Sequence, residues 1–220
     1  MKRRLRVYKK TVSIVNETAT GMYESLVGDK KGFLLESYDK NYDRYTFFGK
    51  EPEEIISSRG NALVITKNDG TQEVRNGNPL ERLKEYYSEF DIVKDNEELS
   101  FSGGLVGNLG YDFVRYSEAL PDNNPDEIGI ETIQMMLMTS FLMVDHVAET
   151  LTAVVLEEPS EEGREQAMEK AGQMIKKAME KKECKRNFYH DGKIIKKSDS
   201  IEEYGEKVEK IKHYIREGHV

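Results

Sequence analysis

Cysteine and long apolar runs are both scarce in this sequence. Its single cysteine, Cys184, has no partner for a disulfide, and no histidine lies near it at the spacing of metal ligands. The longest uncharged apolar run, 132–144, falls well short of the roughly 20 residues that span a bilayer. The basic segment 1–10 is not followed by an apolar stretch of signal-peptide length. We therefore expect a cytoplasmic protein without disulfides, membrane spans or an export signal.

Positive charge is also in deficit. Lysine and arginine number 33 against 41 aspartates and glutamates, which gives a net charge of −8. A chain this acidic repels phosphate backbones, so we expect no nucleic-acid partner. Hydrophobic residues make up 37% of the 220 residues, enough for the core of one large domain or two small ones.

Short strands bounded by turn signals dominate the first half of the chain. Aromatic-rich runs at 33–35 and 45–49, joined by a polar connector, predict two paired strands. The dipeptide Asp69-Gly70 between two extended runs is a strong hairpin signal. The other predicted elements are the hairpin strands 62–66 and 72–75, a short helix within 16–28, and a helix that begins at Asn78-Pro79.

The second half contains the longest apolar segments. The runs 134–146 and 151–156 flank a polar turn and predict a hairpin whose first strand is deeply buried and central in its sheet. A glycine-rich strand followed by a helix is predicted over 103–118. The apolar stripe in 161–182 lies opposite a charged face and predicts a solvated outer helix. These patterns together predict an α+β fold of mainly antiparallel β-sheet with flanking helices.

The last segment carries an apolar seam on a predicted helix. Its members are spaced alternately three and four residues apart, which places them on one helix face. A charged stretch over 181–200 precedes this helix and is the candidate domain boundary. The seam consists of Ile201, Tyr204, Val208, Ile211 and Ile215.

Histidines and glycines offer little catalytic chemistry. None of the four histidines lies at the spacing of a metal pair or a catalytic dyad. Asp145 and His146 follow a buried strand, and a hydrogen-bonded structural pair is favoured over an acid/base unit. The glycines over 103–110 match neither a dinucleotide fingerprint nor a P-loop, so they are expected to permit close backbone approach.

A sharper candidate site joins the ends of two predicted strands. A zwitterionic amino acid could be held by Glu36, facing its ammonium group, together with Ser37 and Arg44. The same residues would serve a structural role if Glu36 and Arg44 formed a cross-strand ion pair beside a capping Ser37. On residue chemistry alone the structural interpretation is favoured.

Several segments in order resemble the N-terminal part of anthranilate synthase component I. They are Phe33-Leu34-Leu35-Glu36-Ser37, Arg44-Tyr45-Thr46-Phe47-Phe48-Gly49, the run from Gly103-Gly104-Leu105-Val106-Gly107 to Arg115-Tyr116, Val144-Asp145-His146-Val147, and the closing segment 200–220. Their order and spacing match that family along nearly the whole chain.

This resemblance implies a function and a domain organisation. It implies a regulatory N-terminal domain over 1–185, followed over 186–220 by a linker and a helix that lead into a chorismate-binding catalytic domain absent from this chain. The whole enzyme would be a lyase of tryptophan biosynthesis that makes anthranilate and pyruvate from chorismate and an ammonia source. The chain alone would carry no catalytic residue and be inactive.

The resemblance also implies ligands and partners. Half of an L-tryptophan feedback site would be formed by Leu35, Glu36, Ser37 and Arg44, and the catalytic domain would supply the rest, so the chain alone would bind tryptophan weakly. A glutamine amidotransferase subunit is the implied protein partner. Neither a metal nor another cofactor is implied for this chain, whereas magnesium is implied for the full-length enzyme.

Two alternatives remain open at this point. The related aminodeoxychorismate synthase component I shares much of the pattern, although the closing Arg216-Glu217-Gly218-His219-Val220 is more similar to the anthranilate enzyme. The chain could also be an autonomous amino-acid-binding or interaction module whose helix seam docks a partner protein.

Overall fold

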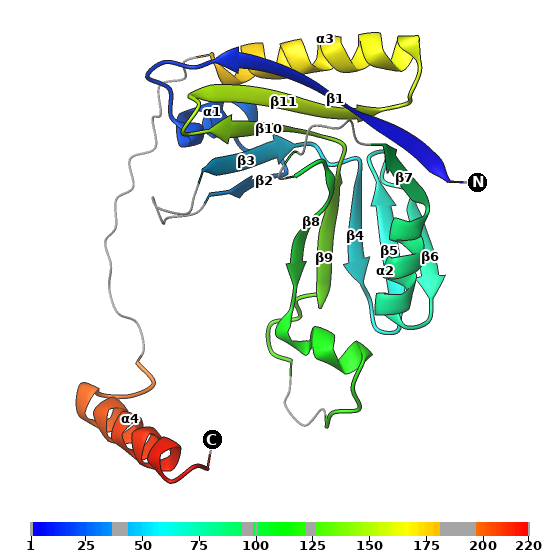
Figure 1. Ribbon diagram of the computed structural model, residues 1–220. Helices are drawn as coiled ribbons and strands as arrows, with labels where there is room; N and C mark the ends of the chain where they lie inside the picture. Colours follow the sequence, from blue (N-terminus) through cyan, green and yellow to red (C-terminus); the bar gives the residue numbers. More distant parts are fainter. Residues whose placement is uncertain are drawn as a thin grey trace. The chain divides into compact units, whose positions relative to one another are not determined.

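The computed structural model describes residues 2–36, 44–93, 99, 101–121, 126–180 and 197–219 (Figure 1). The chain divides into two compact units, Met1–Glu183 and Cys184–Val220. The first unit contains two β-sheets and their covering helices, and the described residues of the second unit contain one helix. No helix within the described ranges has the length and apolar character needed to cross a membrane.

The larger sheet has six strands in the order β2-β3-β10-β11-β1-β7. All neighbouring strands are antiparallel except β1 and β7, which are parallel. The strands are β1 (Arg3–Ser13), β2 (Gly32–Leu35), β3 (Tyr45–Lys50), β7 (Phe90–Val93), β10 (Ser140–Asp145) and β11 (Thr150–Glu157).

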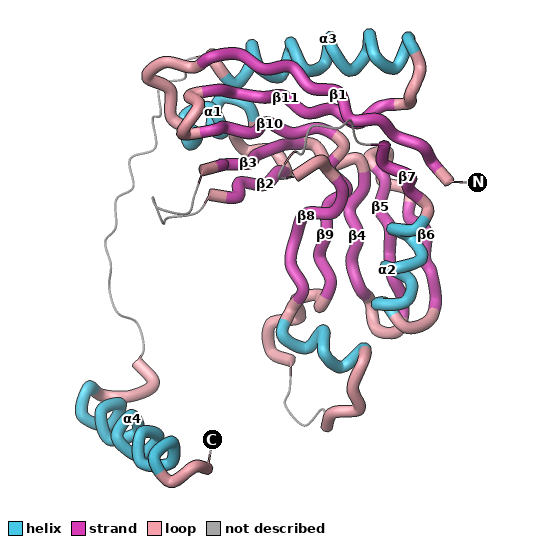
Figure 2. Tube along the Cα trace, in the orientation of Figure 1, coloured by secondary structure: helices cyan, strands magenta, loops and turns pink. Residues whose placement is uncertain are grey.

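The smaller sheet has five antiparallel strands in the order β6-β5-β4-β9-β8. Figure 2 shows it crossing beneath the larger sheet. Its strands are β4 (Glu54–Ser58), β5 (Ala62–Lys67), β6 (Gln72–Asn76), β8 (Gly104–Leu109) and β9 (Ile133–Met138).

Each described α-helix begins where its sequence supplies an N-terminal signal. The hydroxyls of Thr18, Ser160 and Ser200 accept hydrogen bonds from first-turn N–H groups, and Asn78 does so with its side-chain oxygen ahead of Pro79. The helices are α1 (Ala19–Leu26), α2 (Pro79–Ser88), the 3-10 helix η1 (Tyr111–Tyr116), α3 (Glu161–Ala178) and, in the second unit, α4 (Ile201–Arg216).

Strand β10 shows how the larger sheet is buried on both faces. Leu142 and Val144 join the cluster beneath α1 and α3, whereas Phe141 and Met143 join a cluster that also includes Val106 from the smaller sheet. Side chains alternate across a strand, so β10 needs apolar residues at successive positions. A third cluster lies between the smaller sheet and α2.

Most predicted elements are present, and the class is α+β with mainly antiparallel sheets. The paired strands β2 and β3, the hairpin β5–β6 and the central, buried β10 are confirmed. The prediction of one strand over 134–146 is wrong: β9 ends at Met138, β10 begins at Ser140, and the two lie in different sheets. The helix expected after the glycine-rich strand is a 3-10 helix, and β1, β4 and β7 were not predicted.

Candidate functional site

The residues predicted to hold an amino acid lie at one end of the larger sheet. Leu35, the last residue of β2, is opposite Phe47 in β3, and Tyr45 at the start of β3 is opposite Asp145 at the end of β10. Because these strands are antiparallel, Leu35, Arg44 and Asp145 are brought to the same end. Glu36 is exposed and Leu35 is half exposed, whereas Ser37 lies outside the described residues.

Arg44 binds Asp145 through both oxygens of the carboxylate. Its Nε lies 3.0 Å from each oxygen, and its Nη2 donates to Oδ2 at 2.7 Å. Asp145 Oδ1 also accepts hydrogen bonds at 3.0 Å from the N–H groups of Val147 and Ala148, in the turn between β10 and β11. The carboxylate therefore caps a local turn and holds an arginine from another hairpin.

These contacts keep the pair ionised at neutral pH. The hydrogen bonds from Arg44 lower the pKa of Asp145 to about 2, and the two turn N–H groups add to that effect while burial opposes it. The same hydrogen bond raises the pKa of Arg44. Only 9% of the Asp145 side chain is exposed, against 52% for Arg44, so the carboxylate is the fixed partner and the guanidinium reaches solvent.

Two expectations about this region need correction. The carboxylate that pairs with Arg44 is Asp145, not Glu36, because β10 brings Asp145 beside the start of β3. Asp145 and His146 do not act as a pair either: the Nε2 atom of His146 lies 2.8 Å from Thr46 Oγ1, and Asp145 binds Arg44. The sequence analysis thus did not identify Asp145 as the partner of Arg44. The position of Asp145 at the end of a predicted buried strand was the signal that could have indicated this contact.

Two glycines of the 103–110 segment, Gly103 and Gly107, are packed too closely for a side chain, as predicted. A Cβ atom on Gly107 would lie 2.0 Å from the carbonyl oxygen of Gln134 in the neighbouring strand. Gly103 has φ +95°, and a Cβ there would lie 2.7 Å from Leu156 Cδ1. Close backbone approach therefore accounts for Gly107, whereas the positive φ and the contact with the Leu156 side chain account for Gly103.

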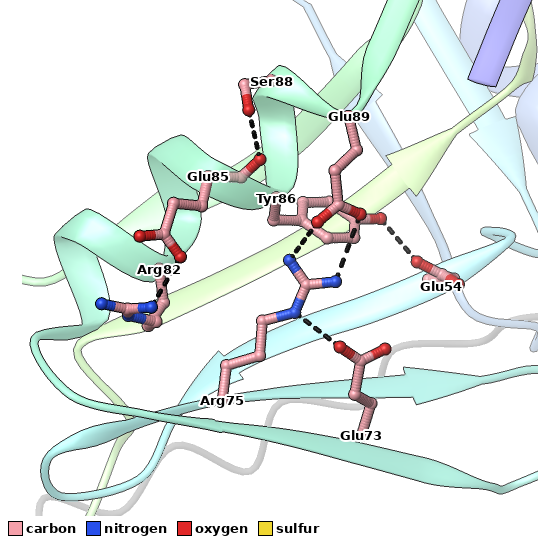
Figure 3. Close-up of polar contacts among 8 residues, drawn as sticks. All are labelled: Glu54, Glu73, Arg75, Arg82, Glu85, Tyr86, Ser88 and Glu89. Atoms are coloured by element: carbon pink, nitrogen blue, oxygen red, sulfur yellow. Dashed lines mark hydrogen bonds and ion pairs between the residues drawn. The ribbon is translucent and has the colours of Figure 1, made fainter. Parts of the chain in front are cut away.

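A second polar cluster ties α2 to the smaller sheet (Figure 3). Arg75 of β6 donates from Nε to Glu73 at 2.6 Å and from Nη1 to Glu89 at 2.6 Å. The hydroxyl of Tyr86, a side chain buried in α2, donates to Glu54 at 2.6 Å, and both burial and this carboxylate raise the pKa of Tyr86. The groups satisfy one another, so the cluster is best explained as a structural link between α2, β4 and β6.

The part of the chain that the structure describes contains no cluster of three or more histidine, cysteine, aspartate or glutamate side chains able to hold a metal ion.

Comparison with known proteins gives a family match over most of the chain. The model of the chorismate binding enzymes matches residues 33–220. This match does not confirm the expectation that the chain ends before the chorismate-binding domain.

The similar curated proteins share one name. Anthranilate synthase component 1 of Acetivibrio thermocellus is 30% identical over 141 residues, which cover 63% of this chain and 28% of that protein. The protein of the same name from Acinetobacter calcoaceticus is 26% identical over 214 residues, covering 93% of this chain and 43% of the relative. The chain thus spans less than half the length of these relatives.

Among solved structures, anthranilate synthase component I from Streptococcus pneumoniae TIGR4 matches with a TM-score of 0.47 and 24% identity. The match covers 73% of this chain and 35% of that chain.

Proposed function

The chain belongs to the family of chorismate binding enzymes, and we propose that it is the N-terminal regulatory part of an anthranilate synthase component I, without the catalytic domain. The observation that carries this proposal is the coverage of the Acinetobacter calcoaceticus relative. That protein matches 93% of this chain, whereas the matched segment is only 43% of the relative. By this proposal, the catalytic machinery resides in the remainder of the relatives.

The proposed activity belongs to the complete enzyme. It converts chorismate, with ammonia or with glutamine through an amidotransferase subunit, to anthranilate and pyruvate, a lyase reaction in the cytoplasmic synthesis of tryptophan. This chain by itself is inactive.

The proposed role of this chain is to sense L-tryptophan at the end of the larger sheet. A ligand can reach Leu35 and Glu36 there, because β2 is an edge strand and both side chains are exposed to solvent. Arg44 is held in place by Asp145 while half of its side chain stays exposed. With Ser37 these residues form half of the site, and tryptophan inhibits by binding one state of the whole enzyme more tightly than the other.

The proposal can be tested on the product of the complete open reading frame that encodes this chain. We expect it to form anthranilate from chorismate and ammonia and to be inhibited by L-tryptophan, whereas the 220-residue chain forms none. Ser37→Phe should abolish inhibition and leave the uninhibited rate unchanged, and Ser117→Phe, at an exposed position elsewhere, should keep inhibition.

Other outcomes would redirect the assignment. Formation of aminodeoxychorismate would identify the alternative branch of the family. Absence of any chorismate-dependent product would favour a binding module, and full inhibition of the Ser37→Phe enzyme would contradict the proposed tryptophan site.

A further inference from the structure

A groove of about 850 Å³ lies along the other edge of the larger sheet, between α2, β7 and the segment that leads into β8. Three consecutive residues of β7, Phe90 to Ile92, line it. Successive side chains of a strand point to opposite faces, so a groove that touches all three runs along the edge of β7. Its volume is within the range of about 300–1,000 Å³ that is usual for small-molecule sites.

Aromatic side chains form half of the apolar lining of this groove, and leucine and isoleucine side chains form the rest. The aromatic side chains are Tyr87 from α2, Phe90 from β7 and Phe101 ahead of β8. Phe101 is fixed by Phe141, with ring centroids 4.8 Å apart, whereas Tyr87 is 51% exposed. Gly103 also lines the groove and, having no side chain, exposes its backbone there. A planar ring can therefore pack on the aromatic side chains.

Polar groups of three kinds also line the groove. Lys84 and Asp91 supply opposite charges, and their present partners, Glu81 at 2.9 Å and Arg4 at 3.6 Å, are themselves largely exposed. Exposed pairs of this kind contribute little to stability, so either side chain can exchange its partner for a ligand.

The third polar group is the hydroxyl of Ser102, which is only 7% exposed. This hydroxyl lies on the wall of the groove and can donate a hydrogen bond to a polar group of a bound molecule.

We propose that this groove binds a free aromatic amino acid. The ring packs against Tyr87, Phe90 and Phe101. The carboxylate of the ligand binds Lys84 and its ammonium group binds Asp91, while Ser102 adds a hydrogen bond. A molecule with an aromatic ring and both charges matches the groove better than an apolar molecule, which would engage neither charge, or a simple anion, which would engage only Lys84.

This site is distinct from the proposed tryptophan site around Glu36. The strand order places β2 at one edge of the larger sheet and β7 at the other. Five strand spacings of about 4.8 Å separate the two edges by roughly 24 Å. A single ligand molecule cannot touch both.

Binding can be measured with L-tryptophan, L-phenylalanine and L-tyrosine on the 220-residue chain. The chain contains no tryptophan, so the indole fluorescence of added L-tryptophan reports the ligand alone. Amide chemical-shift mapping with each amino acid locates the site, and we expect shifts at Asp91 and Gly103. Phenylpropanoate and phenylethylamine, which each lack one charge, should bind more weakly than L-phenylalanine.

Variants of the groove test the individual contacts. Lys84→Gln and Asp91→Asn should each raise Kd about tenfold or more, since each removes one charged hydrogen bond. Ser102→Ala should weaken binding less. Lys176→Gln, at an exposed position on α3, and Glu36→Gln should leave Kd at this groove unchanged.

Several results would overturn the proposal. They are failure of all three amino acids to bind, shifts confined to residues 33–36 and 44–46, unchanged affinity in both charge variants, and equal affinity for either singly charged analogue. Because both charge variants alter exposed side chains, their folding is not at issue.

Discussion

Helices α3 and α4 look alike in sequence and differ in how they are held. Both have an apolar stripe, a serine N-cap and acidic residues in the first turn. Six residues of α3 are buried, and it packs on β11, β1 and α1. None of the α4 residues is buried, and Ile201 is 82% exposed.

The difference separates two sources of helix stability. In α3, burial of Ala167, Ala171 and Ile175 against the sheet supplies the hydrophobic term that most protein helices depend on. In α4 the interactions present are local: the capping box of Ser200 and Glu203, and ion pairs such as Lys212 with Glu209. A helix of the first kind should resist loss of a cap, whereas one of the second kind should not.

The largest expected effect comes from placing a charge on each stripe. Ala171→Asp buries a carboxylate beneath α3 and should destabilise the first unit by about 3–5 kcal/mol, because the site offers the charge no partner. Ile211→Asp in α4 should change stability by less than about 0.5 kcal/mol, because Ile211 is already 54% exposed. Urea unfolding followed by circular dichroism and amide exchange would measure both, and equal effects would contradict the comparison.

Asp145 combines a local contact and a tertiary contact, so two substitutions can separate them. Asp145→Ala removes the turn cap and the pair with Arg44 and should cost about 2–3 kcal/mol. Asp145→Asn keeps an oxygen for the N–H groups of Val147 and Ala148 and should cost about 1 kcal/mol less. Urea unfolding of both variants measures the difference, and equal losses would mean that the turn cap contributes nothing.

The same carboxylate predicts an acid dependence of stability. The folded pKa of Asp145 is lowered to about 2 from an ordinary value of 3.8, so the unfolded chain binds the proton more readily. The stabilisation is fully present above about pH 4 and is lost as the pH falls toward 2. Unfolding free energies measured across this range should fall less steeply for Asp145→Asn than for the unaltered chain, and parallel curves would rule out this contribution.

The smallest expected effect sharpens the comparison most directly. Ser160→Ala and Ser200→Ala each remove one N-cap, a change worth about 1 kcal/mol. In α3 the packed stripe should preserve the helix, whereas α4 should lose amide protection and helical signal. Residue-specific exchange would show this, and equal fraying in the two helices would argue against a packing difference.

Features encoded within a few residues were predictable. The hairpin at Asp69-Gly70 follows from the φ of +83° that glycine adopts at little cost, and α2 begins at Asn78-Pro79 for equally local reasons. Strand β1 was missed because its basic residues mask the alternation of Leu5 and Val7 on one face with Tyr8 and Val12 on the other.

The candidate site was predictable only in part. The predicted pairing of two strands that are adjacent in the sequence placed Leu35, Glu36 and Arg44 close together. The sequence did not identify Asp145, because that contact depends on β10 lying beside β3, a pairing between segments 101 residues apart. The groove beside β7 was equally hidden, since α2, β7 and the lead into β8 meet only in the folded chain.

By itself, the sequence determined the α-helices, the turn at Asp69-Gly70 and the apolar stripes of the helices, since these depend on backbone preferences and hydrogen bonds among near neighbours. Only the tertiary structure decided that 134–146 is divided between two sheets, that Arg44 binds Asp145, and that the stripe of α3 is buried while that of α4 is not. Burial and charge pairing depend on contacts between segments that are distant in the sequence. An apolar stripe indicates that a helix face can be buried, but it does not identify the element that buries it.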